Sequence, residues 1–383
     1  MKVVNTEKVH IKMWLDDIEE GALRQAKNLA NLPFTFHHVA LMPDCHQGYG
    51  MPIGGVLATD NVVIPNAVGV DIGCGMRACK TSVKEIDLEK VVAEIKKVVP
   101  VGFKKHEVDG IEWERNIKYW ENIGPVSSFI HAYWINAVAS FGTLGGGNHF
   151  IELQKDEQGF INIMIHSGSR NLGKQVADHY NYLAAYYNKL WYFQASRDLA
   201  FLPLETPQAN QYLEDMKFCV KYAKMNRALM MQKVKCVISE IIPEAVFSTD
   251  LDVAHNYARL ENHYGKNVMV HRKGATSAKL DEIGIIPGSQ GTASYIVKGL
   301  GNPESFTSCS HGAGRKMGRK EARRTLNLED EKAKLKGIVH SIKTEKDLDE
   351  ATGAYKDIDT VMQNQKDLVR IERKLTPIAV IKG

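Results

Sequence analysis

The segment VGVDIGCGMR, residues 68–77, places an acid and a cysteine in a glycine-rich turn. Asp71 and Cys74 lie three residues apart, so a tight turn could direct a carboxylate and a thiolate to one metal ion. Taken alone the pair is weak evidence. A cysteine in such a turn is more often a small buried hydrophobe, and the acid more often satisfies the turn.

Three histidines in polar settings add imidazole donors: His149 in GGGNHF, His166 in HSGSR and His255 in DVAHNY. Each of them alone is more often a hydrogen-bonded structural histidine. Together with the acid and the thiol they provide N, O and S donors in excess of one tetrahedral site, enough for two metal ions that share a bridging thiolate. The softness of these ligands allows zinc, iron, cobalt or manganese.

A further histidine, His311, lies among small residues in SCSHGAGR, shortly after the glycine- and hydroxyl-rich segment PGSQGTASY. Small side chains let a ligand approach the backbone. Beside Arg315, the imidazole could meet a phosphate as a nucleophile, an acid or a ligand. A neutral imidazole is a competent nucleophile near pH 7.

Two strand-like runs position two of the candidate ligands. HFIEL and INIMIH are separated by the polar loop QKDEQGF, and this pattern predicts a β-hairpin. If Leu153 pairs near Ile161, His149 and His166 fall within one position of each other at the open end of the hairpin.

The remaining pattern predicts helices mixed with strands. Glycines punctuate short apolar runs over residues 42–80, which indicates strands joined by tight turns. Residues 174–245 are expected to form a mostly helical insert. Helices are predicted over residues 15–30, 172–194, 207–242 and 357–371, and a short closing strand over 376–383.

The composition is that of a globular protein. The chain has 383 residues, of which 44% are hydrophobic, and a formal charge of only +4, so any nucleic-acid binding must come from a local basic surface. The segment RKMGRKEARR is one candidate, although a solvated helix face explains it equally well. We expect a cytoplasmic protein with reduced cysteines and no membrane contact, because no signal peptide or bilayer-length apolar run is visible.

Several motifs appear in an order that resembles the RtcB family of RNA-splicing ligases. The resemblance covers about residue 40 to Gly383 and rests on PDCHQGYG, NAVGVDIGCG, GTLGGGNHF, HSGSRNLG, HNY, VHRKGAT, PGSQGTASY and SHGAGR. Gln290 stands where many members of the family have methionine, and NAVGVD replaces a more usual Gly-Gly-Val-Gly stretch. Neither departure removes a candidate ligand.

The resemblance implies an α+β fold for residues 1–383: a single compact domain of mixed or antiparallel sheets flanked by helices. It also implies a GTP- and Mn²⁺-dependent RNA ligase that joins a 3′-phosphate or 2′,3′-cyclic phosphate end to a 5′-hydroxyl end, in tRNA splicing or RNA repair. His311 would become guanylylated by attack on the α-phosphate of GTP. Whether an activating protein partner is needed stays open.

Site roles follow from the same resemblance. Asp71, Cys74 and His149 would hold one manganese ion, and Cys74, His166 and His255 the other. The residues implied for the nucleotide pocket are Asn148, Phe150, Glu152, Ser289, Ser294, Tyr355 and Lys382. Arg170 and Arg315 would bind phosphate, for which a guanidinium offers paired donors.

Two other classes of protein are compatible with part of the pattern. A dinuclear phosphoesterase could cut RNA ends with metal ions and arginines alone, without forming a guanylate. A non-catalytic RNA-binding protein would need neither a complete ligand set nor His311. A lysine-adenylating ligase is disfavoured, because its Lys-x-Asp-Gly signature does not occur in the chain.

Overall fold

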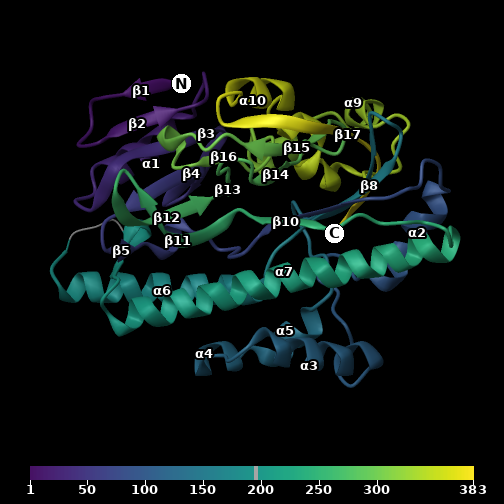
Figure 1. The fold of residues 1–383 in the computed structure, drawn as a ribbon, viewed down its shortest axis with the longest axis horizontal. Helices are drawn as coiled ribbons and strands as arrows, with labels where there is room; N and C mark the ends of the chain where they lie inside the picture. Colours follow the sequence, from purple (N-terminus) through teal and green to yellow (C-terminus); the bar gives the residue numbers. More distant parts are fainter. Residues whose placement is uncertain (194–196) are drawn as a thin grey trace.

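The computed structural model describes residues 1–193 and 197–383, whose strands lie mainly in two sheets (Figure 1). Within these residues one sheet has six strands in the order β1-β2-β3-β4-β12-β11, and the pairing is antiparallel except between β2 and β3. In that order the strands are Lys2–Val4, His10–Met13, Thr35–Tyr49, Met51–Thr59, Lys266–Lys273 and Asn256–His263.

The second sheet in the described part of the chain has seven antiparallel strands in the order β10-β6-β8-β7-β17-β15-β14. These are Leu251–Ala254, Gly75–Lys80, Ile161–Ser167, Phe150–Asp156, Val369–Lys382, Ser294–Gly299 and Ile283–Ile286. Two short ladders connect the layers: β5 (Val62–Val63) with β9 (Leu202–Pro203), and β13 (Ala275–Ser277) with β16 (Ser308–Ser310).

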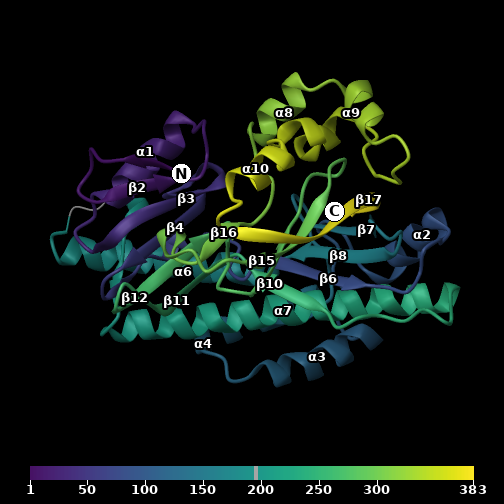
Figure 2. The same ribbon diagram turned by 45° about the horizontal axis from the view of Figure 1, so that its top comes forward.

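Helix α7 runs along the longest axis of the molecule on one side of the sheets, with α6 beside it and α3 farther out (Figures 1 and 2). The opposite side carries α8, α9 and α10 (Figure 2). The α-helices are α1 Glu20–Ala30, α2 Leu88–Val98, α3 Ile111–Ile123, α4 Ser128–His131, α5 Trp134–Ser140, α6 Arg170–Leu190, α7 Pro207–Ile241, α8 Arg319–Thr325, α9 Leu328–Lys334 and α10 Ile358–Asn364. Short 3-10 helices are η1 Pro65–Ala67, η2 Arg197–Leu199, η3 Pro303–Ser305, η4 Glu345–Glu350 and η5 Thr352–Ala354.

Alternation along β8 explains how the sheet serves both a core and a site. Ile161, Ile163 and Ile165 pack in one apolar cluster with side chains of α7, whereas Met164 packs in another cluster with other strands. Successive side chains of a strand point to opposite faces, so His166 shares the face of Met164 and points away from α7. The apolar residues of β8 therefore pack the strand into the core, while His166, near its end, presents a polar side chain.

The structure confirms the α+β class, the helix that begins at Pro207 and the predicted hairpin. Thr206 caps α7 by accepting a hydrogen bond from the backbone N–H of Ala209 at 3.2 Å. The hairpin register differs by two residues from the prediction: Leu153 pairs with Ile163, because the strands extend through the polar residues before a tight turn at Asp156.

The C-terminal prediction was partly wrong. The predicted helix over residues 357–371 ends at Asn364, and the closing strand β17 is long, beginning at Val369. Residues 370–374, the charged first half of β17, are exposed or half-buried and pair with β15, whereas residues 375–382 pair with β7. In residues 1–193 and 197–383, no helix is both long and apolar enough to cross a membrane.

Candidate metal centre and nucleotide pocket

The candidate metal ligands meet at one edge of the seven-stranded sheet. Cys74 directly precedes β6, His166 is near the end of β8, His255 directly follows β10 and His149 directly precedes β7. Because these neighbouring strands are antiparallel, starts and ends alternate along the same edge, and four ligands distant in sequence become neighbours.

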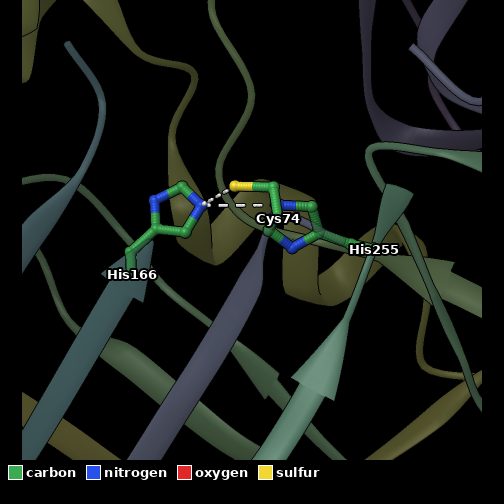
Figure 3. Close-up of side chains that lie close together, drawn as sticks. All are labelled: Cys74, His166 and His255. Carbon is green, nitrogen blue, oxygen red and sulfur yellow. Dashed lines mark hydrogen bonds between the residues drawn. The ribbon is translucent and has the colours of Figure 1, made fainter. Parts of the chain in front are cut away.

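Their donor atoms form two adjacent groups that share the thiol. Cys74, His166 and His255 make one group, and Asp71, Cys74 and His149 the other, with all donor atoms of a group within 4.8 Å of one another. The Cys74 sulfur lies 3.2 Å from His166 Nε2 and 3.5 Å from His149 Nε2. Figure 3 shows the first group, in which His166 Nε2 lies close to both the Cys74 sulfur and His255. Because Cys74 belongs to both groups, the arrangement fits the predicted bridging thiolate.

Backbone carbonyls orient two of the imidazoles. The Nδ1 atoms of His149 and His166 lie 3.1 Å from the carbonyl oxygens of Leu144 and Asn148. A proton on each Nδ1 can be donated to these oxygens, which leaves both Nε2 lone pairs directed into the cluster. These Nδ1–carbonyl contacts therefore favour the tautomer in which Nε2 is free to bind a metal ion.

Burial sets the protonation of this cluster when no cation is bound. Desolvation holds the pKa of His166 and of His255 well below the ordinary value, so both imidazoles are neutral. Desolvation, with Asp71 nearby, raises the pKa of the Cys74 thiol well above its ordinary value. The cluster thus offers neutral imidazoles and a thiol that must lose its proton to bind a metal ion.

Close approach of the backbone requires glycine at two places around the site. A side chain at Gly168 would put its Cβ 2.2 Å from Asp71 Oδ1. A side chain at Gly274, where φ is +59°, would put its Cβ 3.0 Å from His311 Cε1 and against Ile53. The glycines of HSGSR and VHRKGAT therefore make room for a carboxylate and for the candidate nucleophile.

His311 is held by a carboxylate from another strand. Residue 311 directly follows β16, and its Nδ1 lies 2.6 Å from Oδ2 of Asp44 in β3. The same oxygen accepts a hydrogen bond from the His311 backbone N–H at 3.0 Å. Asp44 is fully buried, whereas the His311 side chain is 16% exposed, and its ring lies 4.8 Å from that of His255 between centroids. Nε2 is left to meet a substrate beside the metal cluster.

A cavity of about 240 Å³ opens next to His311 and His166. Predicted site residues in its wall are Asn148, Phe150, Glu152, Ser289, His311, Arg315, Tyr355 and Lys382. Burial raises the pKa of Glu152 to about 7, although Gln154 donates a hydrogen bond to its carboxylate at 2.7 Å. The predicted nucleotide residues, which come from separate parts of the chain, thus largely line one cavity.

Two of the residues predicted to bind the nucleotide or phosphate lie outside the wall of this cavity. Ser294 is fully buried, and its hydroxyl oxygen accepts hydrogen bonds from Gln154 Nε2 at 3.0 Å and from the Gly288 N–H at 3.2 Å. Arg170 lies beneath the metal cluster, where its Nη1 is 3.2 Å from Nδ1 of His149. Its Nε donates to Thr143 Oγ1, also at 3.2 Å, so the guanidinium supports the site from the side of the protein interior.

Sequence reasoning missed two side chains of the site, Arg319 and Glu350, which line the cavity. It placed Asp44 and His46, in PDCHQGYG, at the same site but assigned neither a specific step, and the structure shows Asp44 against His311 and His46 in the wall of the cavity. The motif PDCHQGYG was a signal for Asp44. Nothing in the local pattern around Glu350 indicates that its carboxylate meets three cations.

Comparisons with known proteins agree with this geometry. Residues 25–383 match the family model described as tRNA-splicing ligase RtcB, so the match begins before residue 40. The chain is 37% identical to RNA-splicing ligase RtcB of Escherichia coli K12 over 413 aligned residues, which cover all of this chain and 99% of that protein. It is 32% identical to tRNA-splicing ligase RtcB of Pyrobaculum aerophilum, across 98% of this chain and 95% of that one. A match of this extent, together with the Cys/His cluster, shows that the chain belongs to the RtcB family of RNA-splicing ligases.

Proposed function

We propose that this RNA ligase joins an RNA 3′-phosphate or 2′,3′-cyclic phosphate end to a 5′-hydroxyl end, using GTP and two Mn²⁺ ions. The observation that carries the proposal is the Asp44–His311 pair, 2.6 Å apart, beside a cluster of candidate metal ligands and a cavity of about 240 Å³. Sequence similarity to ligases named for tRNA splicing supports a role in tRNA splicing or RNA repair, which we place in the cytoplasm.

The donor set fits divalent cations. Asp71, Cys74 and His149 would hold one ion, and Cys74, His166 and His255 the other. Bound Mn²⁺ would neutralise the charge that develops on phosphoryl oxygens and lower the pKa of an attacking hydroxyl. Arg170, beneath the cluster, adds a fixed positive charge on the same side.

His311 is the nucleophile of the proposed reaction. Asp44 keeps the proton of the imidazole on Nδ1, so the lone pair of Nε2 can attack the α-phosphorus of GTP. A nitrogen–phosphorus bond forms as the bond to pyrophosphate breaks, and the carboxylate of Asp44 stabilises the positive charge that the ring acquires. The guanylate then passes to an oxygen of the RNA 3′-phosphate, and the 5′-hydroxyl displaces GMP. A cyclic end is first hydrolysed at the same site.

Recognition of guanine is assigned to the part of the cavity wall formed by Glu152, Phe150, Tyr355 and Lys382. When ionised, Glu152 can accept hydrogen bonds from guanine N1 and N2, which adenine does not match. Phe150 and Tyr355 offer aromatic faces in the same wall, and Lys382 lies 5.8 Å above the ring of Phe150. Residues 1–383 would act as one ligase unit, with residues 174–245 as a helical insert.

The mass of the intact protein after incubation with GTP and Mn²⁺ tests this function. We expect an adduct of one GMP on the wild-type protein and none on His311→Ala, while both proteins bind metal equally. An adduct on His311→Ala would place the nucleophile elsewhere. A different result would indicate a phosphoesterase. In that case the metal-loaded wild-type protein would form no GMP adduct but would remove the terminal phosphate from RNA ends.

A further inference from the structure

The carboxylate of Glu350 contacts four other side chains that line the same cavity. Its Oε1 lies 2.8 Å from Arg319 Nη2 and 3.2 Å from Arg315 Nη1. Its Oε2 lies 3.4 Å from Lys382 Nζ and accepts a short hydrogen bond from the Tyr355 hydroxyl. Glu350 is only 5% exposed, so these contacts are shielded from water and are stronger than surface ion pairs.

The side chains that converge on Glu350 need such an anchor. Lys382 is the penultimate residue of the chain, and a lysine side chain loses much rotamer freedom when it is fixed in place. Burial would raise the pKa of Glu350, but the nearby Lys382 and Arg319, the Tyr355 hydroxyl and Arg315 outweigh it and keep the pKa below its ordinary value. The carboxylate is therefore ionised and balances the cations around it.

Gln290 braces the backbone of Glu350. Its Nε2 donates a hydrogen bond to the Glu350 carbonyl at 2.8 Å, and the carbonyl acceptor fixes which end of the amide faces it. Gln290 is buried and lies in the wall of the cavity. Methionine resembles glutamine in length but has no N–H to donate, so Gln290→Met would remove this bond and keep the bulk of the side chain.

We propose that Glu350 is a positioning residue for guanine selection, acting through Lys382 and Tyr355, and that Gln290 holds it in place. The inference rests on the proposed function. A lysine fixed by Glu350 can donate to the O6 acceptor of guanine, whereas adenine presents an N6 donor at the same position. Without the Glu350 carboxylate, Lys382 is no longer held where it can distinguish guanine O6 from adenine N6. His311 and the metal ligands are unchanged.

The test measures the rate of GMP adduct formation against GTP concentration for the wild type, Glu350→Gln and Gln290→Met. Glu350→Gln keeps the shape and removes the charge. We expect the GTP concentration for half-maximal rate to rise about tenfold, from the loss of charge-assisted bonds, while the maximal rate changes less than threefold. Selectivity for GTP over ATP falls in the same variant. Gln290→Met shifts both quantities in the same direction by a smaller factor.

Glu345→Gln is the matched control, because the same chemical change is made at an exposed position of the same 3-10 helix, η4. A merely structural role of Glu350 would lower the amount of active protein, and hence the maximal rate, with the half-maximal concentration and the selectivity unchanged; that result overturns the inference. So does an equal shift in Glu345→Gln. Absence of any adduct on the wild type would refute the proposed function itself, which keeps the two failures distinct.

Discussion

Replacing Asp44 with asparagine tests how the structure activates His311. Oδ2 of Asp44 accepts two hydrogen bonds from His311, from Nδ1 at 2.6 Å and from the backbone N–H at 3.0 Å. Because both partners are donors, asparagine should turn its amide oxygen toward them and preserve the tautomer with a proton on Nδ1. What Asp44→Asn removes is the negative charge that stabilises the imidazole as it becomes positively charged.

The size of the effect follows from this separation of charge and geometry. A hydrogen bond to a charged group contributes about 1.5–3 kcal/mol, so losing the charge should slow guanylylation about 10- to 100-fold. Asp44→Ala removes the orientation as well, and we expect a loss of about 1,000-fold or more. The assay is the single-turnover rate of GMP transfer to the protein.

Metal content and the thermal midpoint of each Asp44 variant must be measured beside the rates. Asp60→Asn is the control, since Asp60 is an acid in an exposed ion pair with Lys266. A rate for Asp44→Asn within threefold of the wild type would refute the electrostatic role. Equal losses in the asparagine and alanine variants would show that the charge carries the whole effect and that orientation by Asp44 adds nothing.

Three further predictions concern the metal cluster, the base pocket and the core. Cys74→Ala removes the donor shared by both groups, so metal bound per protein, measured by elemental analysis, should fall by more than half, whereas the exposed Cys236→Ala leaves it unchanged. Burial raises the pKa of Glu152 to about 7; below that pH the carboxyl is protonated and its two oxygens can no longer both accept from guanine N1 and N2, so GTP binding to His311→Ala should weaken as pH falls through 7, and Glu152→Gln should abolish this dependence. Arg227→Met should lower the free energy of unfolding in urea by about 2–3 kcal/mol, because it removes the fully buried partner that contacts Asp252 at 2.8 and 3.0 Å, while Arg77, at 3.2 Å, still pairs with that carboxylate; an unchanged denaturation midpoint would contradict this estimate.

Local patterns predicted the elements better than the contacts between them. The Thr206-Pro207 pair predicted the start of a long helix, and alternation in INIMIH predicted a strand, because both signals depend on neighbouring residues. The charged run after Val369 was misassigned, since its pairing with β15 overrides the local preference.

The contacts that position His311, the proposed nucleophile, could not be predicted from spacing. Asp44 and His311 are separated by 267 residues, and they meet only because β16 lies against β3, which belongs to the six-stranded sheet. The anchor at Glu350 likewise depends on how η4 folds against the end of β17. Motif resemblance found the groups expected to touch substrate or metal, but the side chains that orient them carry little local signal.

The two halves of the site are held ready by opposite electrostatic means. In the metal cluster, burial keeps His166 and His255 neutral and the Cys74 thiol protonated, so a bound cation must displace the thiol proton. At His311, a buried carboxylate sits against the ring before any substrate arrives. The first arrangement makes the charge of the site depend on bound metal, and the second places a negative charge where the reaction creates a positive one. The proposed guanylylation should therefore require both groups. The cation compensates the negative charge on the phosphate of GTP, and Asp44 compensates the positive charge on the His311 ring.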